Sequence, residues 1–235
     1  MVSADQLTVK TPDGRQLEAI VSGPGQGLPL VFHSVTPMGL VPLRSSLDPA
    51  QCGLRTVFYA RPGYSGSTPH PGRSVANAAA DTAVVLDAIG ADRFVTLGWS
   101  GGGPHALACA ALLHDRCLAA AVVAGPAPFK EAAGVFLAED SKRLRRVEAG
   151  DESELVKNCK QIMESASGAR ADNMADRFTS VADRESMKGQ FADWMAEYFR
   201  ASAASGVEGL REDEVAFAHD WGFKVAHARR VARLR

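Results

Sequence analysis

The 235-residue sequence lacks several features that mark whole classes of proteins. Its formal net charge is -1, so there is no basic excess of the kind that binds nucleic acid or an anionic membrane. Its apolar runs, such as residues 118–126, are too short to cross a bilayer. The first residues have neither the basic nor the apolar region of a signal peptide. We therefore expect a cytoplasmic protein with no nucleic-acid and no membrane partner.

Cysteine is scarce, and its spacing excludes the common cysteine motifs. The four cysteines are Cys52, Cys109, Cys117 and Cys159. None of them forms a C-x-x-C pair, and no spacing in the chain indicates a metal site. We expect reduced, buried thiols and no metal or other cofactor. The hydrophobic content of 46% is enough for one sizeable core.

The order of apolar segments predicts an α/β fold with a mostly parallel sheet. Strands at 7–10 and 17–22, joined by the turn sequence Thr-Pro-Asp-Gly, form an N-terminal hairpin. Further strands are predicted at residues 28–34, 56–61, 93–99 and 118–124. Helices are predicted at residues 42–51, 75–89 and 104–114. Strand and helix alternate from residue 56 onward, which favours parallel strands with crossover helices.

After residue 128 the character of the sequence changes. Residues 130–217 have almost no β-branched runs and are broken only by glycines and short polar turns, so we expect amphipathic helices that form a lid. Four aromatic residues fall at helical spacing there: Phe191, Trp194, Tyr198 and Phe199. They either pack the lid onto the body or line a substrate pocket. The predicted division is a core at 1–127, a lid at 128–217 and a short tail at 218–235.

Residues 98–102 read Gly-Trp-Ser-Gly-Gly, between the predicted strand 93–99 and the predicted helix 104–114. A sharp turn from strand to helix would make side chains at 98 and 102 collide, and glycine removes the collision. Ser100 at the apex would have a strained backbone and project its hydroxyl beyond the sheet. The Gly101 amide would face the same space, where a developing negative charge is stabilised. The pattern predicts a nucleophile elbow; the alternative is a turn whose serine only caps the helix.

With this motif and two others, the chain resembles the α/β-hydrolase superfamily, in its branch of lid-bearing serine hydrolases. Residues 33–37 (His-Ser-Val-Thr-Pro) stand where the family has its His-Gly-x-Pro oxyanion loop. Residues 61–67 (Arg-Pro-Gly-Tyr-Ser-Gly-Ser) stand where it has a Gly-x-Gly-x-Ser turn. The resemblance implies an α/β-hydrolase fold, Ser100 as the nucleophile, and an oxyanion hole made by the amides of Gly101 and Thr36. Val35 and Ser65 stand where the family usually has glycine.

The resemblance also implies a carboxylate after the lid and a histidine after the last strand. Residues 218–235 leave no standard room for either. We therefore expect the last core strands to be missing, as in a hydrolase that is truncated or has a replaced terminus.

Other residues are candidates for the missing roles. Every histidine is a candidate base, and the two nearest the C-terminus, His219 and His227, are slightly favoured over His33, His70, His105 and His114. His33 is instead expected to hold the oxyanion loop by hydrogen bonds. The candidate acids are Asp213, Asp220 and Glu131.

Three hypotheses of function follow. The first is a serine hydrolase that cleaves an ester, amide or similar acyl bond in a small-molecule substrate, with low activity because the usual acid and base are absent. The second is a non-catalytic protein that binds an apolar small molecule under the lid. The third is an incomplete, inactive hydrolase whose uncovered sheet edge would pair with other copies and form a homo-oligomer.

Overall fold

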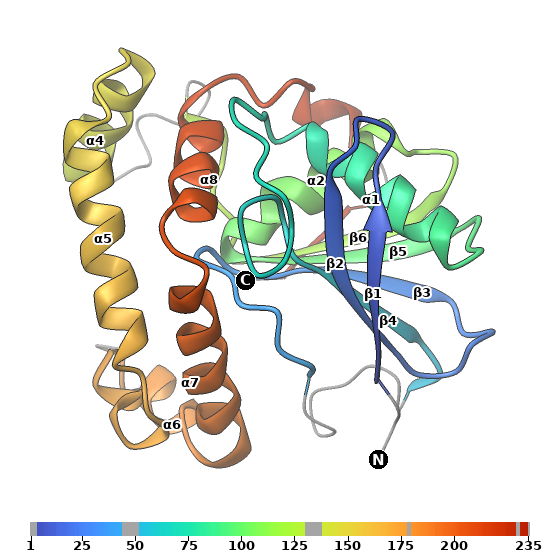
Figure 1. The fold of residues 1–235 in the computed structure, drawn as a ribbon, viewed down its shortest axis with the longest axis horizontal. Coiled ribbons are helices and arrows are strands. Elements are labelled where there is room, and N and C mark those ends of the chain that lie inside the picture. The colour runs from blue at the N-terminus through green and yellow to red at the C-terminus, as the bar shows by residue number, and fades with distance from the viewer. Residues whose placement is uncertain (1–3, 44–51, 130–137, 178–179, 229–230, 235) are drawn as a thin grey trace.

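The computed structural model describes residues 4–43, 52–129, 138–177, 180–228 and 231–234 (Figure 1). Its sheet has seven strands in the order β1-β2-β4-β3-β5-β6-β7. The strands are β1 (Ala4–Lys10), β2 (Gln16–Ser22), β3 (Pro29–His33), β4 (Arg55–Tyr59), β5 (Phe94–Trp99), β6 (Cys117–Val123) and β7 (Val231–Leu234). β1 and β2 form the predicted antiparallel hairpin, and β2 is also antiparallel to β4. All other pairs are parallel, which confirms the predicted mostly parallel sheet.

The helices of the described residues are α1 (Asn77–Ala88), α2 (Gly103–Leu112), α4 (Ala138–Glu148), α5 (Ser153–Ser167), α6 (Val181–Ser186), α7 (Gly189–Ala204) and α8 (Glu208–Ala218). α1 and α2 bury Val85, Leu86 and Cys109 against the sheet residues Val31 and Val57. Helices α4 to α8 lie together to one side of the sheet, at the left of Figure 1. They occupy the segment predicted to be a lid; that they act as a lid stays a prediction.

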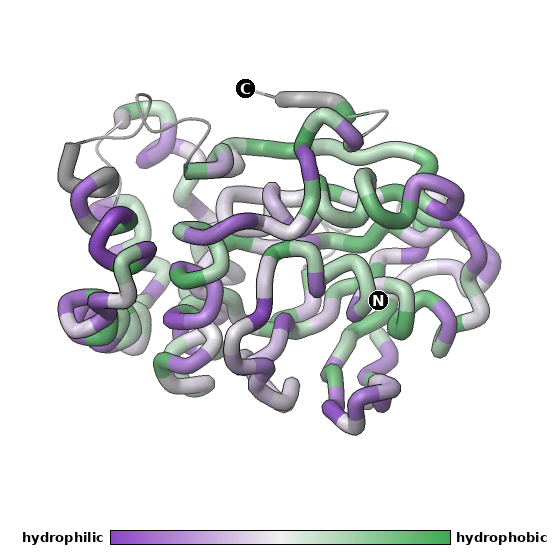
Figure 2. Tube along the Cα trace, turned by 90° about the horizontal axis from the view of Figure 1, so that it is seen from above, coloured by the Kyte–Doolittle hydropathy of each residue, from purple (hydrophilic) through white to green (hydrophobic). Residues whose placement is uncertain are grey.

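The helical segment has the amphipathic pattern that its sequence predicts. Hydrophilic and hydrophobic residues alternate along these helices in Figure 2. Their apolar side chains join the cluster that contains Phe32 and Phe58 of the sheet. No helix in the described part of the chain is long and apolar enough to span a membrane.

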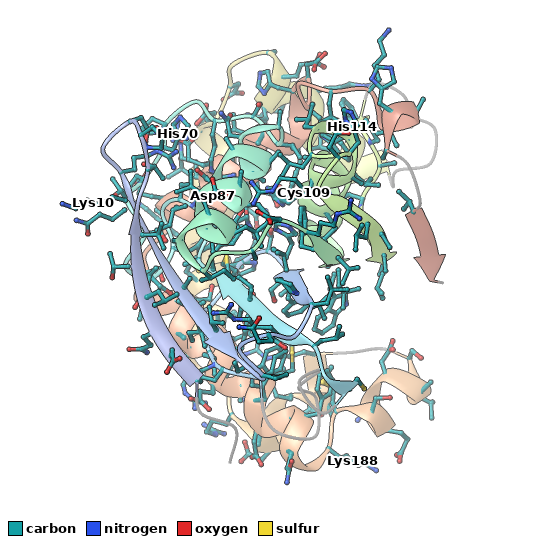
Figure 3. The ribbon with its side chains drawn as sticks, turned by 90° about the vertical axis from the view of Figure 1, so that its right-hand side faces the viewer. Lys10, His70, Asp87, Cys109, His114 and Lys188 are labelled. Carbon is teal, nitrogen blue, oxygen red and sulfur yellow. The ribbon has the colours of Figure 1, made fainter. Side chains whose placement is uncertain are left out.

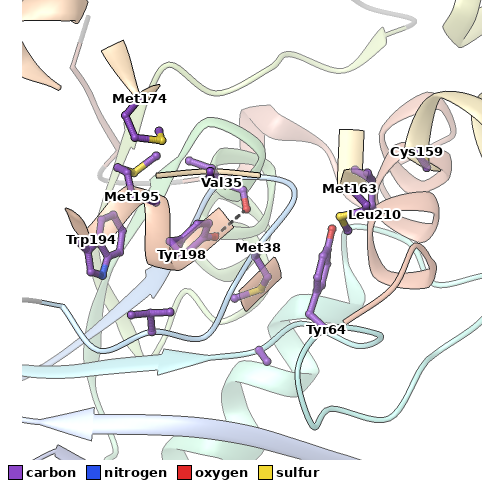
Figure 4. Packing of buried hydrophobic residues seen from close by; sticks show 14 of the residues in the cluster. Val35, Met38, Tyr64, Cys159, Met163, Met174, Trp194, Met195, Tyr198 and Leu210 are labelled. Carbon is purple, nitrogen blue, oxygen red and sulfur yellow. Dashed lines mark hydrogen bonds between the residues drawn. The ribbon is translucent and has the colours of Figure 1, made fainter. Parts of the chain in front are cut away.

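Aromatic residues of α7 attach this helix to the body (Figure 4). Trp194 and Tyr198 are fully buried, with ring centroids 5.2 Å apart. The indole N–H of Trp194 donates to the Pro42 carbonyl at 3.1 Å. Phe191 stacks between Trp194 and Trp99 of β5, with centroid distances of 6.2 and 6.3 Å. These contacts are the packing that the helical spacing predicts.

The C-terminal tail requires a correction. Val231–Leu234 form β7, which runs parallel to β6 from Ala120↔Val231 to Val123↔Leu234. The expectation that the last strands are missing is therefore wrong for one strand. Its short sequence, Val-Ala-Arg-Leu, follows two arginines and lies in the segment predicted to be a short tail. A parallel edge strand needs only backbone hydrogen bonds and a few apolar contacts, and Val231 packs against the cluster that contains Leu107 and Ala108 of α2.

Two further expectations concern the predicted helix at residues 42–51 and the burial of the cysteines. The predicted helix at 42–51 falls almost entirely on residues 44–51, outside the described residues. Cys109, Cys117 and Cys159 are buried and lie outside any disulfide, as expected, whereas Cys52 is exposed.

We predict that Trp194→Ala lowers the free energy of unfolding by about 3–5 kcal/mol, because it removes a fully buried indole and leaves a cavity between α7 and the sheet. Urea unfolding followed by far-UV circular dichroism measures the effect. Val181→Ala, at a side chain that is 77% exposed, is the control and should change stability by less than about 0.5 kcal/mol. Equal stability of Trp194→Ala and wild type would contradict the packing described for α7.

Candidate active site

Ser100 lies at the sharp turn between β5 and α2. Its φ is 51°, in the left-handed region that residues other than glycine rarely adopt. Trp99 before it is still extended, with φ −112° and ψ 129°, and a short 3-10 turn, Ser100–Gly102, leads into α2. The Ser100 side chain is half-buried, and its hydroxyl makes no hydrogen bond to any residue that the structure describes. This is the backbone conformation that the Gly-Trp-Ser-Gly-Gly motif predicts.

Close backbone contacts explain the glycines beside Ser100. A Cβ on Gly98 would lie 2.5 Å from the Gly102 carbonyl oxygen and 2.7 Å from the Gly103 Cα. A Cβ on Gly102 would overlap the carbonyl of His33 at the end of β3. The ends of β3 and β5 and the start of α2 therefore meet with no space for side chains. For Gly98 this is the predicted collision across the turn, whereas Gly102 is required by β3, which the sequence did not predict.

Gly101 and Thr36 are neighbours, although 65 positions of sequence separate them. A Cβ on Gly101 would lie 2.7 Å from the Thr36 Cβ and 3.1 Å from the Thr36 backbone nitrogen. The two residues predicted to supply the oxyanion hole are thus side by side. In the described chain, the residues other than glycine with a left-handed φ are Ser65, Ser100 and Ala124. Val35, which stands where the family usually has glycine, is not one of them. Valine therefore fits its position, whereas Ser65 has a φ of 47°, the conformation for which glycine is better suited.

A buried carboxylate lies behind Thr36. Asp213 of α8 has no exposed surface, and it accepts hydrogen bonds from Arg61 Nη2 at 2.7 Å, Arg73 Nη2 at 2.6 Å, Thr36 Oγ1 at 2.8 Å and the Tyr64 hydroxyl at 3.0 Å. Burial by itself would raise the pKa of Asp213, but the charges of Arg61 and Arg73 outweigh burial and hold this pKa below its ordinary value of 3.8. Asp213 is therefore ionised at neutral pH.

Arg61 joins this carboxylate to the loop after β3. Its Nη1 donates to the Ser34 carbonyl at 2.9 Å, and its Nη2 donates to the Val35 carbonyl at 3.2 Å. The hydroxyl of Tyr198 donates to the same Val35 carbonyl at 3.3 Å (Figure 4). The loop is thus held by Arg61, a residue that is only 2% exposed. Sequence reasoning missed this role of Arg61, although the residue opens the motif 61–67.

Comparison with known proteins agrees with this fold. Residues 26–155, more than half of the chain, match the family model described as "alpha/beta hydrolase fold". The chain belongs to the α/β-hydrolase fold family. A comparison with curated proteins gave no match.

Solved structures of other hydrolases have the same fold. A hydrolase from Pseudomonas aeruginosa PA01 is 20% identical with a TM-score of 0.59, over 91% of this chain and 72% of that one. A thermophilic esterase from Thermogutta terrifontis is 18% identical with a TM-score of 0.61, over 91% and 72%. Epoxide hydrolase A from Mycobacterium thermoresistibile is 18% identical with a TM-score of 0.60, over 93% and 76%. At these identities the similarity shows the fold alone.

Two histidines of this α/β-hydrolase lie under the turn at Ser100 but contact other groups. His33 is buried, and its Nε2 lies 3.5 Å from the Sγ atom of Cys109, which is also buried. Cys109 is labelled in Figure 3. The prediction that His33 holds the oxyanion loop by hydrogen bonds is therefore wrong; Arg61 and Tyr198 do so, because alternation along β3 turns the imidazole toward α2. Burial and the charge of Arg61 lower the pKa of His33 to about 3, so the ring is neutral.

His105 is the second of these histidines. Its Nδ1–H donates to the Gly101 carbonyl at 2.9 Å, and its Nε2 lies 3.9 Å from Asp213 Oδ1. Burial, followed by the charge of Arg61, lowers the pKa of His105 well below 6.5. His105 is thus neutral and oriented by Gly101.

The other candidates for base and acid do not gather around Ser100. His219 and His227 are exposed, and His219 Nδ1–H donates to the Val215 carbonyl at 2.9 Å. His114, at the end of α2 in Figure 3, has a side chain that is 53% exposed, and His70 is half-buried in the loop before α1. Asp220 is exposed and accepts a hydrogen bond from its neighbour Gly222. Glu131 lies outside the described residues.

These residues therefore supply no observed partner for Ser100. None of the described histidines or carboxylates hydrogen-bonds to its hydroxyl. The described residues also contain no group of three or more His, Cys, Asp or Glu arranged to hold a metal ion. What the structure brings together is the serine, Gly101 and Thr36.

An apolar pocket of about 230 Å³ lies between the sheet and α7. It is lined by Leu30, Phe32, Leu43, Leu97, Trp99, Val123, Phe191 and Trp194. Trp99, the residue before Ser100, and Phe191 of the predicted lid both belong to this lining. Phe191 and Trp194 thus both pack α7 onto the sheet and line this pocket; that the pocket takes a substrate stays a prediction.

We predict that Gly102→Ala lowers the free energy of unfolding by about 3 kcal/mol or more, because the added Cβ overlaps the backbone of β3 and the neighbouring main chain must move. Gly25→Ala is the control, since a Cβ there meets nothing within 4 Å, and it should change stability by less than about 0.5 kcal/mol. Urea unfolding measures both. A stable Gly102→Ala protein would contradict the close approach of β3 to the turn.

We predict that Asp213→Asn destabilises the protein by about 3–5 kcal/mol at neutral pH, because Arg61 and Arg73 keep their buried charges without a counterion. The folded-state pKa of Asp213 is depressed, so below about pH 4 the unfolded chain binds a proton that the folded chain does not. The stabilisation is therefore present above this pH and lost as the pH falls.

Urea unfolding at about pH 7 and about pH 3 measures this dependence. The stability difference between wild type and Asp213→Asn should shrink at the lower pH. Asp193→Asn, at an exposed carboxylate of α7, is the control and should leave stability unchanged at neutral pH. A pH-independent difference would show that the charge of Asp213 is not what stabilises the fold.

Proposed function

We propose that this α/β-hydrolase is a serine hydrolase in which Ser100 attacks the carbonyl of an ester, amide or similar acyl bond in a small molecule. The left-handed backbone of Ser100 between glycines that admit no Cβ is the observation that carries the proposal. The strained turn places this serine at the end of a central strand, which is the position of the nucleophile in a nucleophile elbow.

In the proposed reaction, Ser100 Oγ forms a bond to the carbonyl carbon, and the carbonyl oxygen becomes an oxyanion. The amides of Gly101 and Thr36 donate hydrogen bonds to that oxyanion, a contribution that typically amounts to a factor of about 10²–10³ for each donor. The carbonyl then re-forms as the bond from its carbon to the leaving group breaks, and the leaving group takes up the proton that the Ser100 hydroxyl gave to solvent. Water attacks the resulting acyl-enzyme, which releases the acid and returns a proton to Ser100 Oγ. Because no base contacts Ser100 in the described residues, we expect slow turnover; losing the triad's base costs several orders of magnitude.

A second candidate function is the binding of an apolar small molecule without turnover. The pocket beside α7 favours it, since only apolar side chains line about 230 Å³ of space. This function would need neither a base nor an oxyanion hole.

A fluorophosphonate probe distinguishes the two. The probe reacts with a serine only as far as that serine is activated, and no described base contacts Ser100. We therefore predict that wild-type protein is labelled slowly. Ser100→Ala should reduce labelling to background. Ser65→Ala is a matched control, because Ser65 is also a left-handed serine but is exposed and lies outside the turn after β5, and it should be labelled as wild type.

Folded wild-type protein that is not labelled at all would sink the serine-hydrolase proposal. If that unlabelled protein bound an apolar fluorescent dye and Trp99→Ala weakened the binding, the second function would stand. Equal labelling of wild type and Ser100→Ala would place the reactive residue elsewhere.

A further inference from the structure

We propose that Asp213 is a positioning residue for the oxyanion hole: its carboxylate, carried by α8, fixes Thr36, whose side chain packs against Gly101. This inference rests on the proposed function, because it concerns the same two amides. Asp213 touches no substrate in it and acts only through other residues.

The direct link runs through the Thr36 hydroxyl. Thr36 Oγ1 donates to Asp213 Oδ2 at 2.8 Å and accepts from Arg61 Nη2 at 2.9 Å. Arg61 in turn is bound to Asp213, so the three groups form a closed ring of hydrogen bonds. Charge-assisted bonds of this kind are short and strong, and they fix the rotamer of a side chain that could otherwise turn. Because the Thr36 side chain packs against Gly101, its orientation sets how the position-36 amide faces the turn.

His105 holds Gly101 from the same side, but its Nε2 makes no hydrogen bond to Asp213 or to any other described residue. Its Nδ1–H donates to the carbonyl of Gly101 at 2.9 Å, and the opposite side of its ring faces Asp213 Oδ1 at 3.9 Å. The ring is 1% exposed and is confined by Phe217 of α8, with centroids 5.7 Å apart. The peptide that carries the Gly101 carbonyl is thus held from the same side as Thr36.

Asp213 comes from a different part of the fold than the residues that it binds. Thr36 and Arg61 belong to loops of the sheet and His105 belongs to α2, whereas Asp213 belongs to α8, in the segment predicted to be a lid. The placement of α8 and the geometry of the proposed oxyanion hole therefore depend on one charged group. Oxyanion holes act through preorganised donors, so a small displacement of one donor weakens the stabilisation.

Thr36→Val tests the proposal with little risk to folding, because valine has the same shape but lacks the hydroxyl. We predict that the maximal rate of fluorophosphonate labelling falls about tenfold or more while the concentration of probe at half-maximal rate is unchanged. Thr36→Ser, which keeps the hydroxyl, should restore the rate. Asp81→Asn is the control for a lost buried charge, since Asp81 is 2% exposed and paired with Arg15 at 2.9 Å, away from the turn at Ser100.

A second measurement does not require any reactivity. In ¹H–¹⁵N spectra, Asp213→Asn should move the amide resonances of both Thr36 and Gly101, whereas Asp81→Asn should leave them in place. Urea unfolding of every variant shows that each is folded under the conditions used. If Asp213→Asn does not fold, the Gly101 amide resonance can be compared between Thr36→Val, which should move it, and Thr36→Ser, which should not.

The outcomes separate the two proposals. A Thr36→Val protein that is less stable but labelled at the wild-type rate, with an unmoved Gly101 resonance, would show that the network is only structural and overturn the inference. If wild type is never labelled, the proposed function fails and the spectra alone decide the positioning role. Moved resonances in Asp213→Asn would then support it, and unmoved ones would overturn it.

Discussion

The structure depends on one fully buried ionic interaction, between Asp213 of α8 and the guanidinium groups of Arg61 and Arg73. Removing charges from water is costly, and the cost is offset only if each charge meets its partners with good geometry. Arg61 satisfies this condition by also binding the carbonyls of Ser34 and Val35. This ionic cluster therefore joins three parts of the fold: the helical segment, the turn after β4 and the loop after β3. Each part fixes the position of the other two.

A second constraint acts at the turn that carries Ser100. The turn brings β3, β5 and α2 so close that Gly98 and Gly102 leave no room for a Cβ. Ser100 has a left-handed φ there, a conformation that costs of order 1–3 kcal/mol and persists only where the surroundings determine it. The buried ionic cluster and the crowded turn meet at Thr36, which packs on Gly101 and bonds to Asp213.

Most of the fold could be predicted because its signals are local. Apolar runs, the Thr-Pro-Asp-Gly hairpin turn and helical spacing identified the strands of the core and the α7 aromatics. β7 was missed because a short edge strand is held mainly by backbone hydrogen bonds, which leave little trace in composition. His33 was given the wrong partner, since its motif places the residue in a loop while its position on β3 directs the ring toward Cys109.

The sequence by itself determined the turn at Ser100, because the collision that demands glycine at position 98 lies within the turn and follows from local backbone geometry. The glycine at position 102 is demanded by β3, which only the tertiary structure brings to the turn. Only the tertiary structure decided which groups surround Ser100. Asp213 was one acidic residue among several near the end of the helical segment, and nothing in its neighbours distinguishes it. Its partner Arg61 lies 152 positions away in the chain, and such a pairing is set by how helices and loops pack, which no local pattern of residues encodes.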